Sequence, residues 1–309
     1  MHTRDIEFLC ASLPQGRTVY PYYKDRYGLQ LLRYAVRQPT AVHTLRSAPV
    51  ASLLQKPRLR DLLAACDGTL SPLHLLSADG DSSPRCHVLT LSSWNGSQTS
   101  RGGSSLVLQL NFASEHDRAL RSLLKLPSGR DPFNYSSHPS LRSDAIDRRY
   151  TLAWARLDID LDADEALIEE VQSDWVRVAR YAFSSVSAGH TGYLQRRCGS
   201  DVQPAAFMKY YCEVLAPYAE IWDEAMLSAA LFFLREELGI SRIYYHSPET
   251  GVAFKNIKWN APPRSLYTEL PRKFCFRETE DLPKMLRDNN RIRCLRRHQP
   301  GLRLNRLTV

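Results

Sequence analysis

One short stretch of this sequence carries an unusual density of side chains that could transfer protons. It reads Glu169-Glu170-Val171-Gln172-Ser173-Asp174-Trp175 and follows an apolar Leu-Ile pair. The apolar lead and the alternation predict a strand in which Glu170, Gln172 and Asp174 share one face and their neighbours the other. Carboxylates are depleted in strands, so the pattern indicates either a polar cleft or a strand end that caps the next helix. Both interpretations stay open.

A carboxylate at the end of a strand is suited to general base catalysis. Partial burial raises the pKa of a carboxyl group toward working pH, where it can deprotonate an amine or a hydroxyl. Glu170 or Asp174 is the candidate base, and Gln172 or Ser173 would orient the substrate. Tyr245 and His246, at the end of a later apolar strand, are candidate general acids.

The elements that would position these groups follow from hydrophobic periodicity. Alternating runs predict hairpins, and helical spacing predicts a central helix that is apolar on more than one side. The expected elements are a hairpin over 86–91 and 105–112, a second over 150–160 and 166–173, the central helix over 217–238, and then a strand over 242–246, a short helix over 248–257 and a strand over 272–277. This order predicts an α/β fold with a mixed, mainly antiparallel sheet flanked by helices.

The chain divides into three expected parts. Residues 1–80 form a helical N-terminal segment packed on the body, 81–280 form the mixed α/β domain, and 281–309 form a basic C-terminal tail. The arginine-rich composition of the last part is typical of segments that contact polyanions.

The order of elements in the second half resembles the Gcn5-related N-acetyltransferase superfamily. The resemblance is carried by Ile243-Tyr244-Tyr245-His246, by the segment from Pro248 to Ile257 and by that from Arg272 to Arg277. It implies an acyltransferase-like C-terminal half and an acyl-carrier cofactor such as acetyl-CoA.

The same resemblance implies a loop of pattern Q/R-x-x-G-x-G/A, whose backbone amides hold a pyrophosphate at a helix N-terminus. The nearest run here is Arg196-Arg197-Cys198-Gly199-Ser200-Asp201, with Asp201 where the pattern has a small residue. Arg196 and Gly199 are therefore candidate cofactor contacts. Lys255, Asn256 and Tyr267 lie where the superfamily often places further carrier contacts.

The stretch from Glu169 to Trp175 also looks like a signature, roughly E-E-[IV]-Q-S-D-W, of uncharacterised domains in polyvalent proteins of bacteriophages and mobile elements. The resemblance covers about residues 150 to 276 and implies a bacterial or phage origin.

Composition and charge favour a folded protein with an anionic partner. The 309 residues contain 41 Lys and Arg against 33 Asp and Glu, a net charge of +8. Basic residues beside aromatic ones, Lys24 and Arg26, and the arginines Arg293, Arg296 and Arg297 are candidate nucleic-acid contacts. Seven scattered cysteines without a C-x-x-C pair predict reduced thiols and no bound metal. With no long apolar run or targeting leader, we expect a cytoplasmic protein that does not contact membranes.

Two functions therefore compete on the sequence alone, while a third, a metal-dependent hydrolase or nuclease that uses Glu169, Glu170, Asp174 and His190, lacks a spacing that fixes ligand geometry. One is an acyltransferase-like enzyme that acts on an amine or hydroxyl through a carboxylate base. The other is a noncatalytic nucleic-acid-binding or interaction factor, for which a continuous basic face would be the signature.

Overall fold

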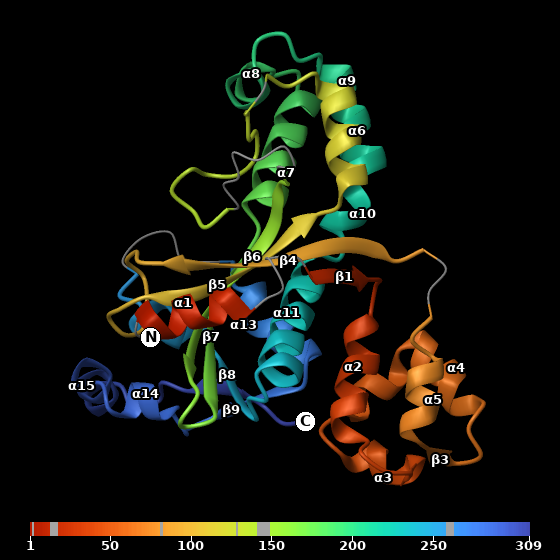
Figure 1. Cartoon of the computed structure of the whole chain (residues 1–309), viewed down its shortest axis with the longest axis vertical. Coiled ribbons are helices and arrows are strands. Elements are labelled where there is room, and N and C mark those ends of the chain that lie inside the picture. Colours follow the sequence, from red (N-terminus) through yellow and green to blue (C-terminus); the bar gives the residue numbers. More distant parts are fainter. Residues whose placement is uncertain (2, 13–17, 81–82, 128, 141–148, 258–262) are drawn as a thin grey trace.

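The chain folds around one eight-stranded sheet in a computed structural model that describes residues 1, 3–12, 18–80, 83–127, 129–140, 149–257 and 263–309 (Figure 1). The strand order is β1-β4-β5-β6-β7-β8-β10-β9. Neighbouring strands are antiparallel except β7 and β8, which run parallel. The strands are β1 (Thr18–Tyr22), β4 (Arg85–Trp94), β5 (Ser105–Phe112), β6 (Thr151–Asp160), β7 (Glu165–Gln172), β8 (Arg242–Tyr245), β9 (Phe276–Thr279) and β10 (Leu304–Leu307). The predicted mixed α/β class with a mainly antiparallel sheet is confirmed.

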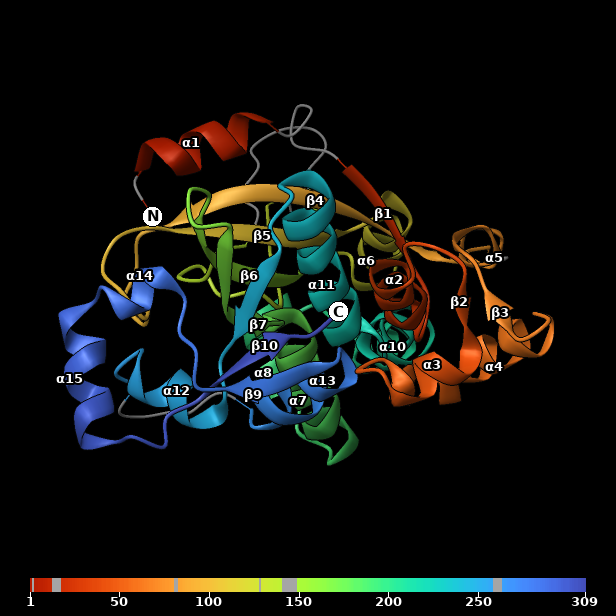
Figure 2. The same ribbon diagram turned by 90° about the horizontal axis from the view of Figure 1, so that it is seen from below.

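The two predicted hairpins form the middle of the sheet. β4 pairs with β5, β6 pairs with β7, and every residue of β5 is buried. Helix α11 (Trp222–Phe232) lies against β5, β6 and β7 (Figure 2). Its residues 224–231 are all buried, as expected for a helix that is apolar on several sides, and it continues as a π-helix over Phe233–Glu237.

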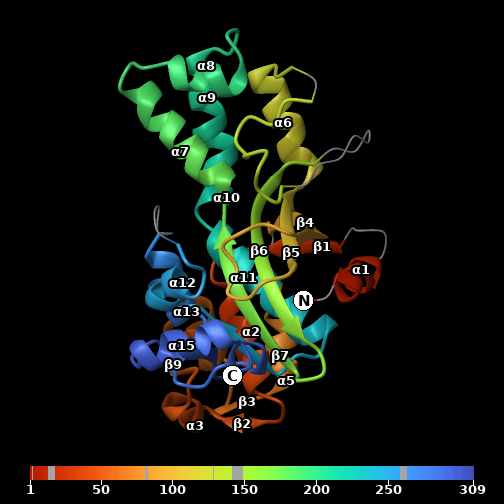
Figure 3. The ribbon, with the colours of Figure 1, turned by 90° about the vertical axis from the view of Figure 1, so that its left-hand side faces the viewer.

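Helices that follow β5 and β7 form an upper lobe (Figures 1 and 3). Trp175, in the first turn of α7, is fully buried, and its indole N–H donates to the Tyr210 hydroxyl at 2.8 Å. The Trp175 ring meets Phe112 and Phe133 edge to face, so an aromatic core ties the lobe to the end of β5. The lobe comprises α6 (Ser114–Leu124), α7 (Asp174–Ser187), α8 (Gly192–Cys198), α9 (Pro204–Lys209), a π-helix (Tyr210–Leu215) and α10 (Ala216–Ala219).

The N-terminal segment is mainly helical and also supplies the edge strand β1. The side chains of Tyr20, Tyr22 and Tyr27 are buried, so they pack the segment on the body and do not offer a stacking surface. The expected boundary after residue 80 borders residues 81–82, which lie outside the described residues. The elements are α1 (Thr3–Ser12), α2 (Arg26–Ala35), α3 (Val42–Ser47), a 3₁₀-helix (Ala51–Gln55), α4 (Pro57–Ala64), α5 (Pro72–Ser77) and the small pair β2 (Thr40–Ala41) and β3 (Thr69–Leu70).

The C-terminal part corrects two sequence-based expectations. The strand predicted over 272–277 begins only at Phe276, because the preceding residues form α13 (Ser265–Lys273) with Leu266 and Leu270 buried at helical spacing. The part predicted as a basic tail instead forms α14 (Lys284–Arg287), α15 (Asn290–His298) and β10, and β10 lies between β8 and β9. Its leucines at 304 and 307 are buried, which explains why it enters the sheet.

Candidate active site

β7 and β8 separate where the polar stretch begins. Their parallel pairing covers only Glu165–Ile168 and Arg242–Tyr245. β7 continues to Gln172, whereas the chain after β8 turns into α12 (Pro248–Ala253) through a capping box between Ser247 and Thr250. Among the described residues, the β7 edge from 169 to 172 therefore has no strand neighbour on the β8 side.

A β-bulge in β7 brings two glutamates to one side of the sheet. The pairing with β6 passes from Arg156–Glu170 to Leu157–Ile168, so Glu169 is an extra residue without a partner on β6. A bulge of this kind interrupts strict alternation. Both carboxylates consequently act electrostatically on the same ammonium group, that of Lys255. The expectation that Glu169 and Glu170 face opposite sides is wrong for this reason.

Glu169 is the acceptor at the centre of a fully buried hydrogen-bond network. The backbone N–H of Ser100 donates to Oε1 at 3.0 Å, and its hydroxyl donates to Oε2 at 2.9 Å. Nε2 of His246 lies 3.1 Å from the same Oε2 and 2.9 Å from Ser100 Oγ, while Nδ1 lies 3.1 Å from Thr250 Oγ1. In a serine hydrolase the hydroxyl and the carboxylate bind opposite nitrogens of the histidine. Here the Ser100 hydroxyl and the Glu169 carboxylate both contact Nε2 of His246, which is not the serine hydrolase arrangement. The network instead holds the 95–104 loop on the sheet.

The protonation states in this network follow from burial and its partners. Burial alone would raise the pKa of Glu169, but the hydrogen bonds from His246 and Ser100 and the charge of Lys255 lower it to about 2. Burial lowers the pKa of His246 in spite of its carboxylate neighbour. An ionised Glu169 therefore faces a neutral imidazole, and a proton on Nε2 satisfies both groups.

A second buried pair of charges lies beside this network. Glu170 pairs with Arg156, and its Oε2 lies 3.6 Å from Lys255 Nζ. Lys255 also donates to the backbone oxygen of Glu169 and to the Tyr267 hydroxyl, both at 3.1 Å. Burial raises the pKa of Glu170, but the charges of Lys255 and Arg156 outweigh that effect and lower it. Two carboxylates thus balance two cations, and Lys255 satisfies a carbonyl on the free edge of β7.

A half-exposed imidazole lies at the far end of β7. The Nδ1 atom of His138 is 2.7 Å from Oδ2 of Asp174, whose side chain is 1% exposed against 32% for that of His138. Gln172 and Arg177 each donate to Oδ1 of Asp174 at 2.7 Å. The Trp154 ring lies edge-on to the imidazole. No partner of His138 Nε2 is found in the part of the chain that the structure describes. A buried carboxylate that orients an accessible imidazole is the arrangement of a general base.

The predicted catalytic residues therefore fall into two places. Gln172 and Asp174 meet at His138, whereas Glu170 and His246 belong to the buried networks around Lys255 and Glu169. Tyr245 is fully buried against Tyr267, and its hydroxyl has no hydrogen-bond partner among the described residues. Burial raises the pKa of Tyr245 far above its usual range, so this phenol remains protonated.

The predicted cofactor contacts do not come together. Arg196 and Gly199 lie at the end of α8 on the upper lobe, whereas Asn256 follows α12, which lies below that lobe (Figure 3). The helix N-terminus after β7 is already occupied, because the Ser173 side chain accepts the Val176 N–H and the Asp174 carboxylate lies in the first turn. A pyrophosphate at that position would meet a carboxylate.

The predicted nucleic-acid contacts lie in two separate places, on α15 and at the start of α2 (Figure 2). Lys24 pairs with Glu220, and Arg26 pairs with Asp79 at 3.1 Å. Arg293, Arg296 and Arg297 line a groove beside α15. The two basic sets thus differ in their surroundings, since Lys24 and Arg26 are paired with carboxylates whereas the arginines of α15 line a groove.

Sequence reasoning missed three residues of these networks, Ser100, Arg156 and His138. Arg156 carried a usable signal, because a charge in the middle of an apolar strand requires a buried partner. Ser100 lies in a polar loop, and His138 lies in a segment without periodicity, so neither differed from its surroundings.

The described residues contain neither a candidate metal site nor a candidate membrane span. Within these ranges, no group of three or more His, Cys, Asp and Glu side chains could hold a metal ion. No helix in the same ranges is long and apolar enough to cross a membrane.

Comparison with known proteins finds no relative of this chain. The sequence matches no family model, and no curated protein or solved structure matches it.

Proposed function

We propose that this protein is an acyltransferase-like enzyme that moves an acyl group from a thioester carrier to an amine or a hydroxyl. The observation that carries the proposal is the geometry of β7. Its pairing with β8 stops after Ile168, and an accessible imidazole oriented by a buried carboxylate lies at its far end. The succession of strand, helices, strand and short helix around this point is the order that resembles the Gcn5-related N-acetyltransferase superfamily.

In the proposed reaction, His138 is the general base and Asp174 is its positioning residue. The imidazole takes the proton of the acceptor N–H or O–H while the acceptor atom attacks the carbonyl carbon of the thioester. The carbon–sulfur bond then breaks, and the departing thiolate receives the proton from the imidazolium. Gln172 and Arg177 hold the Asp174 carboxylate and so fix the imidazole ring. The base predicted from the sequence as Asp174 thus becomes the residue that orients the base.

The buried charges contribute differently in this proposal. Oε2 of the Glu170 carboxylate is engaged by both Arg156 and Lys255, so that oxygen is held by internal cations. Lys255 instead holds the free edge of β7 in position through the Glu169 carbonyl. A rigid support of this kind keeps the end of β7 in register with the groups that react.

The test measures thiol release from acetyl-CoA by the purified chain in the presence of a panel of primary amines and alcohols. We expect His138→Gln to lower the rate about 100-fold or more, since general base catalysis contributes roughly 10² to 10⁴. Asp174→Asn should also lower the rate and shift its pH profile, which a purely structural role would not do. The matched control is His190→Gln, an exposed histidine on the same lobe.

Two outcomes would overturn the proposal. One is an equal rate for His138→Gln, His190→Gln and the wild type. The other is a wild-type protein that neither releases thiol nor gains thermal stability with acetyl-CoA, because a ligand that binds the folded state raises the melting temperature.

A further inference from the structure

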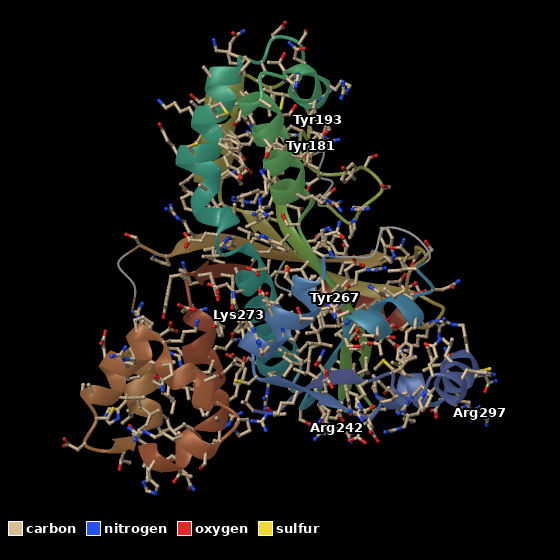
Figure 4. The ribbon with its side chains drawn as sticks, turned by 180° about the vertical axis from the view of Figure 1, so that it is seen from behind. Tyr181, Tyr193, Arg242, Tyr267, Lys273 and Arg297 are labelled. Atoms are coloured by element: carbon tan, nitrogen blue, oxygen red, sulfur yellow. The ribbon has the colours of Figure 1, made fainter. Side chains whose placement is uncertain are left out.

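A groove of about 550 Å³ lies beside α14 and α15 in the lower part of the molecule. Figure 4 shows Arg297 at this edge, well away from Tyr267 in the centre. Its lining comes from two helices and the segments next to them: Glu280, Leu282, Arg287, Arg293, Arg296, Arg297 and Pro300. The groove is thus built from four arginines and two apolar residues, with one carboxylate.

The positive charge in this groove is not neutralised from within the described parts of the chain. The one lining carboxylate, Glu280, pairs with Arg303 at 2.8 Å, which is not a lining residue. Arg287 donates to the Leu282 carbonyl at 2.9 Å, so its guanidinium is held at the wall by a neutral group. Arginines that converge without counter-charges repel one another, and an anion placed among them relieves that repulsion.

Helix stability accounts for part of this arrangement only. Arg296 and Arg297 lie in the last turn of α15, where positive charge interacts favourably with the helix dipole. That effect does not explain Arg293, one turn earlier, or Arg287, which comes from α14. Convergence of arginines from two helices on one hollow is the feature that helix stability leaves unexplained.

The wall of the groove is held rigidly. Ile292 on the inner face of α15 is fully buried, and the Asn289 side chain caps the helix by accepting the N–H groups of Arg291 and Ile292. Arg291 then donates to the backbone oxygens of Ser100, at 2.6 Å, and of Phe254. α15 is therefore fixed to the same loop that the Glu169 network holds.

We infer that this groove binds a small ligand with clustered phosphates, such as a nucleotide that carries two or more of them. Guanidinium groups match phosphate oxygens in paired hydrogen bonds, and the volume lies in the range of small-molecule sites. The exposed Pro300 offers an apolar surface for the ring of the ligand, and the buried Leu282 lies at the wall of the groove. The inference is independent of the proposed function, which assigns no phosphate site.

The experiment measures binding of ATP, coenzyme A and adenosine to the full chain by titration calorimetry. We expect phosphate-bearing ligands to bind and adenosine not to bind. The double variant Arg293→Gln/Arg297→Gln should lose about tenfold or more in affinity, since each 1.4 kcal/mol is a factor of ten. The matched control, Arg46→Gln/Arg60→Gln, removes two exposed arginines from α3 and α4 and should bind as the wild type does.

The comparison of different ligands also shows which kind of phosphate compound the groove binds. If ATP and coenzyme A both bind, and the groove variant loses affinity for both equally, the groove recognises the nucleotide part that the two ligands share. Binding of a single-stranded oligonucleotide much more tightly than ATP would overturn the inference in favour of a nucleic-acid surface. Equal losses in both double variants, or no binding of any phosphate ligand, would also overturn it. His138→Gln should leave nucleotide binding intact, so failure here is distinct from failure of the proposed reaction.

Discussion

Replacement of Glu169 by glutamine should destabilise the protein by an amount that depends on pH. The carboxylate is fully buried, accepts from Ser100 twice and from His246 once, and has a pKa lowered from 4.5 to about 2. That pKa difference corresponds to at most about 3 kcal/mol of stability at neutral pH, because part of it comes from the charge of His246, which is neutral there. Glutamine keeps the shape but removes the charge that balances Lys255, so we expect Glu169→Gln to cost about 3 to 5 kcal/mol.

The pH dependence gives the sharper test. A carboxyl group with a lowered pKa in the folded state stabilises the fold above its unfolded pKa and loses that contribution as pH falls toward its folded pKa. For Glu169 the loss occurs between pH 4.5 and about 2. At pH 3.5 the unfolded state already binds a proton, and about 1.4 kcal/mol of the contribution should be gone.

The assay is urea unfolding of wild type and variant at pH 7, 5 and 3.5, followed by the fluorescence of the five tryptophans. The free-energy gap between the two proteins should be largest at pH 7 and should narrow by pH 3.5. Glu278→Gln, at an exposed position on β9, is the matched control and should change stability by less than about 0.5 kcal/mol. A gap below 1 kcal/mol at pH 7, or one of equal size at pH 3.5, would refute the reasoning.

Two further outcomes follow from buried groups elsewhere. Burial raises the pKa of Glu224 to about 7, so the folded protein holds a proton that the unfolded chain releases above pH 4.5. Stability should therefore fall by about 3 kcal/mol as pH rises from 4.5 to 7 on account of this group, and calorimetric melting of Glu224→Gln should show a smaller fall. Thiol labelling under native conditions should be fast at the three exposed cysteines and slow at the buried ones until urea is added, because burial raises the pKa of Cys198 to about 12 and that of Cys275 to about 11. Fast labelling of all seven thiols in the folded protein would contradict this burial. The exposed set is Cys86, Cys212 and Cys294.

The parts of the fold that depend on local pattern could be predicted from the sequence. The β4–β5 and β6–β7 hairpins, the buried helix α11 and the strand β8 all have a strong period of their own. In the C-terminal half, the sequence pattern predicts the wrong element where signals for a strand and for a helix overlap. Residues 265–273 carry Pro271 and scattered charges, and their helical form depends on burial of Tyr267 against the rest of the fold.

The candidate site was predicted less completely, for two physical reasons. A bulge adds one residue to β7, and counting alternate positions cannot detect it, so the side on which Glu169 lies was assigned incorrectly. The partners of the polar stretch also come from distant segments: Ser100, His138 and Lys255 meet β7 only after the sheet has formed. Gln172 and Asp174 could be identified because Gln172 ends the strand and Asp174 begins the helix that follows it directly in the sequence.

The position of β10 has a consequence for the order in which the protein can assemble. β9 comes before β10 in the chain, but in the described sheet it reaches the other strands only through β10. While the chain emerges from the ribosome, residues 276–279 therefore have no sheet partner until 304–307 have been made. β8 likewise keeps one edge open during that interval, and an open edge is a template for pairing with another chain. The final strand thus closes the lower half of the sheet, and a chain truncated before residue 304 should aggregate more readily than the full chain.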